Sequence, residues 1–237
     1  MVMKLEAIAR ELGKIKAMVA DYDRTTTNPD LTPSRRAFDA IKIFKKKMGI
    51  VFILASGRPL SFFINYPEIL EVCDAVVAEN GAVIFYPKSN EKILMGSDIS
   101  GMVKEILERL NVPADFFEVI ISINRSYEKL IIETLKSSEL PVNVEFNVDS
   151  MMILPRGVSK LNGVLEALRR MGYGDAGFMA FGDGENDLTL MSRASIAIAV
   201  ANAIPEIKRI AHYVTSKPYG DGVAEFLELL IKHHEPQ

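Results

Sequence analysis

The sequence predicts an α/β fold, with a mainly parallel sheet and a small inserted α+β module. Two observations lead to this prediction. Short apolar runs without polar alternation, typical of strands covered on both faces, alternate with amphipathic helical stretches. This pattern breaks after residue 86 and returns after residue 154, with short helices and strands in between. We therefore expect a core made of residues 1–86 and 155–237, with an insert at residues 87–154.

The core is expected to begin with an amphipathic helix near residues 5–15 that packs against the rest of the domain. Pro33 marks the start of the helix predicted over residues 33–48. Asn-Gly at residues 80–81, between two apolar runs, predicts a hairpin. The other predicted core elements are strands over 16–20, 50–55, 75–78, 82–85, 178–181, 195–200 and 213–214, and helices over 33–48, 60–64, 159–171, 188–191, 204–210 and 223–232.

The insert is predicted to follow a polar, proline-containing linker at residues 86–90. Its expected elements are helices over 97–110 and 126–135 and strands over 118–123, 142–147 and 151–154. Residues 155–157, Pro-Arg-Gly, mark the return to the core.

Bulk properties exclude several classes of function. The net charge of −3 argues against a nucleic-acid-binding protein. The single cysteine, Cys73, cannot form an internal disulfide, and no apolar run approaches the roughly 20 residues that span a bilayer. No signal peptide is evident, so we expect a cytoplasmic protein that binds neither nucleic acid nor membranes.

Polar side chains follow three of the predicted strands. Asp21 and Asp23 follow the first, Ser56 the second, and Asp183 and Asp187 a later one. Parallel strands bring their carboxyl ends to one edge of the sheet, where ligands bind in open α/β folds. Close carboxylates repel one another unless a cation intervenes, and Mg²⁺ prefers oxygen ligands. We therefore predict a Mg²⁺ site that acts on a phosphate.

The acidic segment at residues 183–187, and a lysine that we consider as a further site residue, also have simpler interpretations. Residues 183–187, taken alone, could equally be a turn with helix-capping acids. Lys160, at the start of the helix after the insert, could be an ordinary surface lysine. The acidic pair at the other strand end favours a site, in which Lys160 would hold a nucleophile and a phosphate together.

These residues resemble the motifs of the haloacid dehalogenase (HAD) superfamily of phosphatases. The four motifs are Asp-x-Asp-x-Thr at residues 21–25, an apolar strand ending in Ser-Gly-Arg at 56–58, Lys160, and Gly-Asp-Gly-x-Asn-Asp at 182–187. They occur in order along essentially the whole chain. The resemblance implies a Rossmann-like core sheet and an aspartyl-phosphate mechanism.

The resemblance also implies roles for individual residues. Asp21 would be the nucleophile and Asp23 the general acid and base. Mg²⁺ would be held by Asp21, the Asp23 carbonyl and Asp183, with Asp187 and Asn186 close by. Substrate contacts would come from Ser56, the Gly57 amide and Lys160, with Thr25 and Arg58 as further candidates.

An insert between the second and third motifs is similar to the C2B cap class of the Cof-type branch. The short chain and compact insert look most like archaeal phosphoglycolate phosphatase-type proteins. Two features depart from the family pattern. Arg24 stands where glycine is usual, and a helix precedes the first motif. As a whole, the resemblance to this branch implies hydrolysis of a small phosphorylated metabolite, such as phosphoglycolate or a sugar phosphate, by a monomer or homodimer.

Two alternative functions remain open from the sequence. A phosphohexomutase would use the same aspartyl-phosphate but return the phosphoryl group to a sugar. A binding module without catalysis would only sense phosphate ligands. Insert residues such as Asn124 or Arg125 are candidates for selecting the substrate, which the sequence does not identify.

Overall fold

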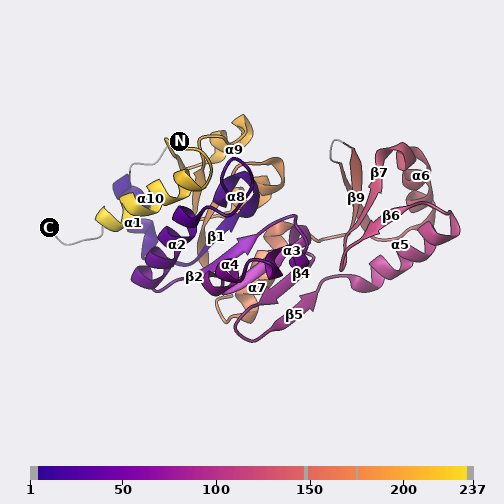
Figure 1. The fold of residues 1–237 in the computed structure, drawn as a ribbon, viewed down its shortest axis with the longest axis horizontal. Helices are drawn as coiled ribbons and strands as arrows, with labels where there is room; N and C mark the ends of the chain where they lie inside the picture. Colours follow the sequence, from indigo (N-terminus) through magenta and orange to yellow (C-terminus); the bar gives the residue numbers. More distant parts are fainter. Residues whose placement is uncertain (1–4, 147–148, 175, 234–237) are drawn as a thin grey trace.

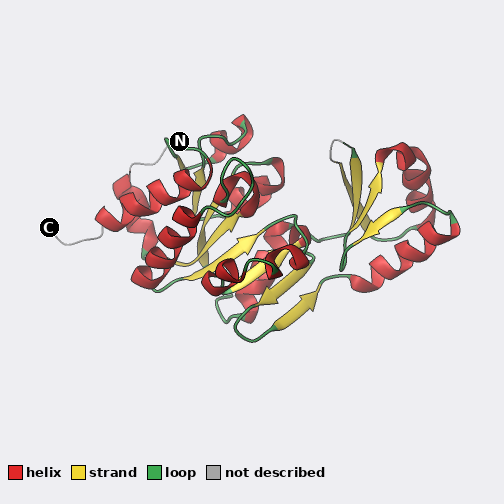
Figure 2. Cartoon of the chain, viewed as in Figure 1, coloured by secondary structure: helices red, strands yellow, loops and turns green. Residues whose placement is uncertain are grey.

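The computed structural model describes residues 5–146, 149–174 and 176–233, which form two sheets with helices packed against them (Figures 1 and 2). The strands are β1 Ile15–Asp21, β2 Val51–Ala55, β3 Ala75–Ala78, β4 Val83–Tyr86, β5 Glu91–Leu94, β6 Ala114–Phe116, β7 Ile121–Asn124, β8 Val142–Phe146, β9 Ser150–Pro155, β10 Gly177–Gly182, β11 Ile196–Ala199 and β12 Tyr213–Val214. The helices are α1 Leu5–Leu12, α2 Arg35–Met48, α3 Leu60–Ile64, α4 Pro67–Val72, α5 Ser97–Arg109, α6 Glu128–Ser138, α7 Lys160–Arg170, α8 Leu188–Arg193, α9 Pro205–Ile210 and α10 Tyr219–His233.

The large sheet has the strand order β12-β11-β10-β1-β2-β3-β4-β5. The pairs from β12 to β3 are parallel, whereas β4 and β5 add to the edge in antiparallel fashion. Strand β1 lies between β10 and β2, and its residues Ala17, Met18, Val19 and Ala20 are fully buried. The unbroken apolar pattern thus reflects cover on both faces, and the predicted α/β fold is confirmed.

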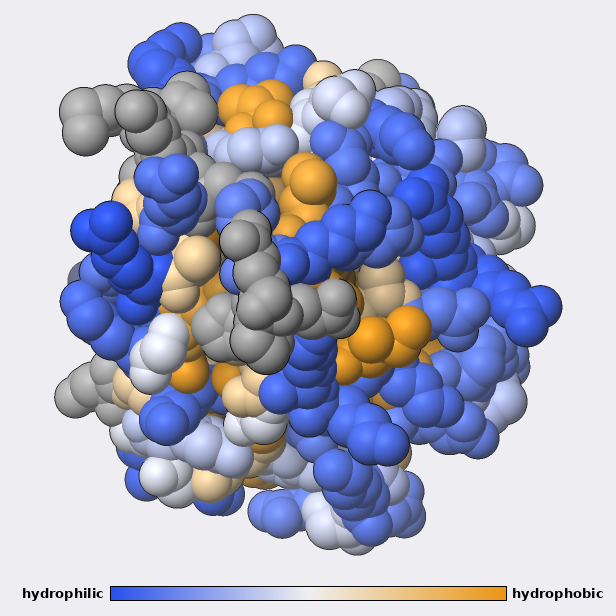
Figure 3. Space-filling view, turned by 90° about the vertical axis from the view of Figure 1, so that its left-hand side faces the viewer, coloured by the Kyte–Doolittle hydropathy of each residue, from blue (hydrophilic) through white to orange (hydrophobic). Residues whose placement is uncertain are grey.

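Helices α2 and α10 pack against each other, and α7 packs against α8. The predicted helix before the first motif is also present: α1 contacts α10, and its Ile8 and Leu12 belong to the main hydrophobic core. Seen from the end farthest from the insert, the molecule is mainly hydrophilic, with small hydrophobic areas (Figure 3). Across the described residues, every helix is too short or too polar to cross a lipid bilayer.

The small sheet has the order β6-β7-β9-β8 and is antiparallel throughout. Helices α5 and α6 lie on its far side, away from the core (Figure 1). Residues such as Val103, Leu107, Ile131 and Met151 form a second hydrophobic core between these helices and the sheet. The predicted α+β insert is therefore a separate layer with its own core.

Three sequence predictions for the insert need correction. Strand β5 pairs with β4 in the large sheet, so residues 87–90 form the turn between these strands and not a linker, and the large sheet continues one strand past residue 86. Strand β6 was missed, because it is only three residues long. The strand expected from residue 118 begins at Ile121. The expected strand end at residue 147 lies outside the described residues.

Between β6 and β7, the chain of the insert packs on the core. Val119 and Ile120 are buried in the main hydrophobic core. The carboxylate of Glu79, at the tip of the β3–β4 hairpin, accepts hydrogen bonds from the backbone N–H groups of Glu118, Val119 and Ile120 at 2.9–3.0 Å. This contact holds the insert in a defined position relative to the strand ends of the core.

Candidate active site

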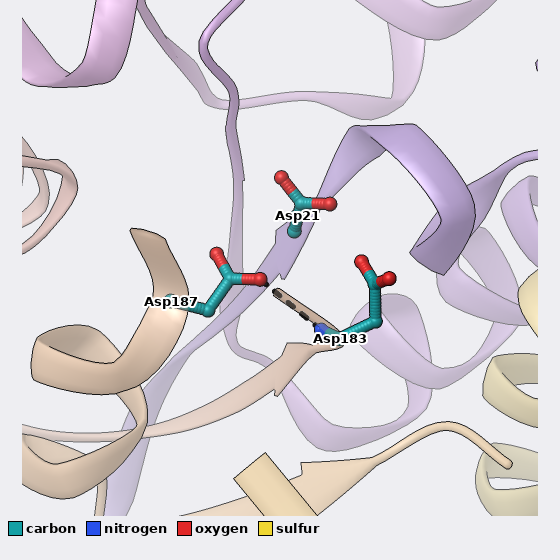
Figure 4. A group of neighbouring side chains, drawn as sticks. All are labelled: Asp21, Asp183 and Asp187. Carbon is teal, nitrogen blue, oxygen red and sulfur yellow. Dashed lines mark hydrogen bonds between the residues drawn. The ribbon is translucent and has the colours of Figure 1, made fainter. Parts of the chain in front are cut away.

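Three aspartates converge at the carboxyl ends of two neighbouring core strands. Asp21 is the last residue of β1, and Asp183 directly follows β10, which pairs with β1. Asp187 ends the short turn after β10, and the three side chains point toward a common space (Figure 4). One carboxylate oxygen from each lies within 4.8 Å of the others, and all three side chains are buried. The structure thus brings these residues together as one acidic cluster.

Lys160 supplies a cation to this cluster from the first position of α7. Its Nζ lies 2.5 Å from Asp21 Oδ1 and 2.8 Å from Asp187 Oδ1. The side chain is 1% exposed, so the interpretation of Lys160 as a surface lysine does not hold. Gly81 permits this approach, because a Cβ there would lie only 2.0 Å from the Ser159 carbonyl oxygen.

The charges of the cluster do not balance. Burial raises the pKa of Asp21 well above its usual range, against the opposing effect of Lys160, and Asp187 raises it further. Burial, with the added repulsion of Asp187, raises the pKa of Asp183 to about 6. Burial alone would lower the pKa of Lys160, but Asp187 and Asp21 raise it instead. One ammonium therefore faces three carboxylates.

An added divalent cation would offset this excess of negative charge. The cluster offers carboxylate oxygens, the donors that Mg²⁺ prefers, from two strand ends. The residues present therefore fit a Mg²⁺ site formed by Asp21, Asp183 and Asp187.

The turn after β10 is shaped to hold Asp187. Its Oδ2 accepts hydrogen bonds from the backbone N–H groups of Asp183 and Gly184, at 3.1 and 3.2 Å. A Cβ on Gly182 would lie 2.8 Å from the Cβ of Asp187, so the turn requires glycine there. The backbone thus fixes one oxygen of Asp187 and leaves the other for Lys160.

Asp23 is not a member of the acidic cluster, and its side chain pairs with Arg58. Nε and Nη2 of Arg58 donate to the Asp23 carboxylate at 2.6–2.9 Å. The guanidinium lies over the Phe62 ring, 4.1 Å from its centroid, and near Tyr22. Asp23 is about one-third exposed and lines a cleft beside the cluster. It therefore has access to bound ligand, and Arg58 fixes its orientation.

The remaining candidate residues divide into two groups. Gly57 and Asn186 line the cleft. Ser56 is fully buried, and its hydroxyl accepts a hydrogen bond from the backbone N–H of Arg58. Thr25 is also fully buried and donates to Asp183 Oδ1 at 3.1 Å. This contact positions Asp183, whereas the sequence suggested a substrate contact for Thr25.

Arg24 adopts a left-handed conformation with φ of 60°, a region that glycine enters more readily than arginine. Two hydrogen bonds hold this backbone: Arg24 N–H donates to Thr27 Oγ1, and the Arg24 carbonyl accepts from Asn202 Nδ2. Its Nε lies 3.4 Å from Asp183 Oδ2, but the side chain is 55% exposed. Arg24 therefore reaches the edge of the acidic cluster from solvent.

The cleft has a volume of about 330 Å³ and is bounded by the acidic cluster on one side and by Met152 of the insert on the other. Asn80, from the β3–β4 hairpin, also lines it. A larger groove of about 620 Å³ lies between α3, α4 and the β4–β5 edge. Its lining is mostly apolar and includes none of the strand-end carboxylates, so the smaller cleft is the candidate site.

Sequence reasoning missed Asn80 and Met152 as cleft residues. Asn80 carried a usable signal, since Asn-Gly is typical of left-handed backbone and its φ is 50°. Met152 carried none, because a methionine in a strand usually fills a core. Asn124 and Arg125 do not line the cleft; Asn124 Oδ1 caps the following turn and Arg125 pairs with Glu128.

The fold and the site together define the class of the protein as a phosphatase. Residues 18–111 and 101–227 match the family model of haloacid dehalogenase-like hydrolases. The chain belongs to this family, as its motifs predicted.

Curated relatives of the chain include archaeal phosphatases. Phosphoglycolate phosphatase 2 of Saccharolobus solfataricus is 33% identical over 93% of this chain and 95% of its own length. The phosphoglycolate phosphatase of Archaeoglobus fulgidus is 30% identical over 92% and 97%. Among solved structures, a HAD subclass IIB sugar phosphatase matches with a TM-score of 0.67 at 20% identity, over 90% and 98% of the two chains. A haloacid dehalogenase-like hydrolase from Bacteroides thetaiotaomicron matches with a TM-score of 0.75 at 22% identity, over 92% and 100%.

Proposed function

We propose that this chain is a Mg²⁺-dependent phosphomonoester hydrolase that acts through an aspartyl-phosphate on Asp21. One observation carries the proposal: Asp21 ends a central strand in a buried cluster where Lys160 and two further aspartates surround it. Lys160 lies 2.5 Å from one oxygen of Asp21, which fixes the carboxylate for attack. Such positioning accounts for much of the rate in phosphoryl transfer.

In the first step, a carboxylate oxygen of Asp21 attacks phosphorus and the ester oxygen leaves on the opposite side. Lys160 offsets negative charge on the nucleophile and on the phosphoryl oxygens. Bound Mg²⁺ would supply further charge neutralisation and orient the phosphoryl group. The Gly57 amide and the Ser56 hydroxyl are assigned to the phosphoryl oxygens.

Asp23 is assigned as the general acid and base. It would give a proton to the leaving oxygen and then take one from the water that hydrolyses the intermediate. Arg58 holds its carboxylate through two nitrogen atoms, so Asp23 stays directed at the cleft while its proton moves. In this assignment Asp23 contributes its backbone carbonyl to the metal, and its side chain remains available for proton transfer.

The substrate is expected to be a small phosphorylated metabolite. The cleft of about 330 Å³ suits a small ester, and Met152 bounds it on the insert side. The names of the curated relatives support phosphoglycolate, and the name of the subclass IIB structure supports a sugar phosphate. These two classes differ in the charge of the leaving group.

Inorganic phosphate release from a panel of phosphate esters, measured with Mg²⁺ and with EDTA, tests the proposal. We expect Mg²⁺-dependent release from several small esters and loss of release in EDTA. Mass spectrometry of quenched protein should show a phosphoryl adduct on Asp21. Isomerisation of a hexose phosphate without release would indicate a mutase, and no turnover of any ester would refute the proposal.

A further inference from the structure

One face of the small sheet is directed at the candidate active site. Met152 on this face lines the cleft, and Leu154, two residues further on, is buried in the main core. Glu145 lies directly opposite Met152 in the strand register, and its carboxylate accepts a hydrogen bond of 3.3 Å from Asn80 Nδ2. The opposite face carries Ile153 and packs on the helices of the insert.

The face directed at the core is polar and carries no cation. Its members, by strand alternation, are Asp115, Ser122, Asn124, Asn143, Glu145, Ser150, Met152 and Leu154. None of the four strands contains a lysine or an arginine. The basic residues within 95–155 lie instead on α5, on α6 or in the turn before α6, and they are Lys104, Arg109, Arg125, Lys129 and Lys136.

The cations on the core side of the cleft are already matched by carboxylates. Arg58 donates to Asp23 through Nε and Nη2. Arg24 pairs with Asp183, and Lys160 lies between Asp21 and Asp187. A carboxylate on the leaving group would therefore lie near Glu145, and none of these three cations would be free to pair with that carboxylate.

Asn80 adds a hydrogen-bond acceptor to the same wall. Its side chain is 4% exposed, and Oδ1 is the one buried side-chain oxygen or nitrogen without a partner among the described residues. Oδ1 lies beside Gly57, 3.0 Å from where a Cβ of that residue would be, and Nδ2 is held by Glu145. An unpaired buried acceptor suits a hydroxyl group of a ligand.

We propose that Glu145 determines specificity by favouring esters with uncharged, hydroxyl-bearing leaving groups over esters whose leaving group carries a carboxylate. The proposal rests on the proposed phosphatase function. In-line attack by Asp21 directs the leaving group away from the acidic cluster, toward the part of the cleft lined by Asn80 and Met152, where Glu145 lies directly behind Asn80 and accepts its hydrogen bond. There a half-buried carboxylate repels a second one, and like-charge contact of this kind is an effective way to reject a competing ligand.

The proposed preference differs from the substrate in the names of the curated relatives, because phosphoglycolate carries a carboxylate on its leaving group. 2-Phosphoglycolate and 2-hydroxyethyl phosphate have the same number of carbon atoms, and they differ by a carboxylate in place of a CH₂OH group. Their kcat/KM ratio therefore isolates the charge of the leaving group. We expect the wild-type enzyme to prefer 2-hydroxyethyl phosphate by about tenfold, which corresponds to a difference of about 1.4 kcal/mol.

Two substitutions at residue 145 test the role of the charge. Glu145→Gln keeps the shape and an oxygen for Asn80 Nδ2, so we expect the preference to shrink to about twofold. Glu145→Lys should reverse it in favour of 2-phosphoglycolate. The control is Glu133→Gln, which removes the same charge from an exposed position on α6 and should leave the ratio unchanged.

Each outcome decides the inference. A wild-type preference for 2-phosphoglycolate, or a ratio that does not move in Glu145→Gln, would overturn it while the phosphatase function stands. If both two-carbon esters are poor substrates, the same ratio is measured with 3-phosphoglycerate and glycerol 3-phosphate. Absence of hydrolysis for every ester would refute the proposed function itself, and the specificity role with it. Thermal unfolding of each variant establishes that the comparison is between folded proteins.

Discussion

Strand β1 of the large sheet is fully buried from Ala17 to Ala20, whereas every residue of β8 in the small sheet is half-buried or exposed. At the end of β1, Asp21 and Asp187 share the buried ammonium of Lys160 as an oppositely charged partner. On the small sheet, Glu145 is half-buried and has an amide as its hydrogen-bond partner. In the proposed scheme, the core holds groups whose chemistry needs fixed geometry, and the insert holds a group, Glu145, that discriminates between ligands. Substitutions in the core should therefore have much larger effects on turnover.

The largest effect is expected for Asp21→Asn. The amide is a poor nucleophile and cannot form the aspartyl-phosphate, so kcat should fall by about 10⁴-fold or more. Phosphate release under single-turnover and steady-state conditions measures this. Asp39→Asn, on the exposed side of α2, is the matched control. Retention of Mg²⁺-dependent turnover in Asp21→Asn would show that another group is the nucleophile.

A second large effect is expected for Lys160→Met. Methionine fills similar space but leaves the buried carboxylates of Asp21 and Asp187 without their ammonium partner. We expect kcat to fall by roughly 10²–10³-fold and the free energy of unfolding in EDTA to fall by about 3 kcal/mol. Steady-state phosphate release measures kcat, and urea unfolding with and without Mg²⁺ measures the free energy of unfolding. Lys129→Met on α6 should change neither quantity, because that side chain is exposed.

A substitution at Glu79 should break the contact between the core and the insert. In Glu79→Ala, the N–H groups of residues 118–120, two of them buried and one partly buried, lose their acceptor, so we expect the free energy of unfolding to fall by about 2–3 kcal/mol. Limited proteolysis should become faster in the loop between β6 and β7. Glu79→Gln retains an acceptor oxygen and should recover part of the loss. Equal stability of Glu79→Ala and wild type would mean that the insert is held by its apolar contacts alone.

The smallest effect concerns the pH dependence of stability in EDTA. The pKa of Asp183 is raised to about 6, so the folded state holds this proton over a range in which the unfolded state has released it. Stability should therefore fall as pH rises from about 4 to 6, by on the order of 2 kcal/mol from this group. Asp21 acts in the same direction. Melting temperatures across this range should show the slope in wild type and a weaker slope in Asp183→Asn, and saturating Mg²⁺ should flatten or invert it. A melting temperature that rises with pH in EDTA would contradict the charge balance described for the cluster.

Much of the core follows from local patterns. Buried parallel strands leave an uninterrupted apolar signature, and a right-handed βαβ connection brings their carboxyl ends together. The meeting of Asp21 with Asp183 could therefore be predicted from residues that lie 162 positions apart. The insert could be predicted as a unit for the same reason, because its mixed pattern interrupts the alternation of the core. The place of strand β5 in the core could not be predicted, since its pairing with β4 and its separation from the small sheet depend on the final packing.

The sequence by itself determined the class of fold, the family and the residues gathered at the strand ends, because each depends on periodicity and on short motifs. Only the tertiary structure decided which face of the insert meets the core. Glu79 reaches the loop before β7, and Glu145 reaches Asn80, across separations of 39–41 and 65 residues. No local pattern encodes such contacts, because strand alternation defines two faces and does not say which one will face the site. The orientation results from the packing of Val119, Ile120 and Leu154 into the core, and it places the carboxylate of Glu145 beside the cleft.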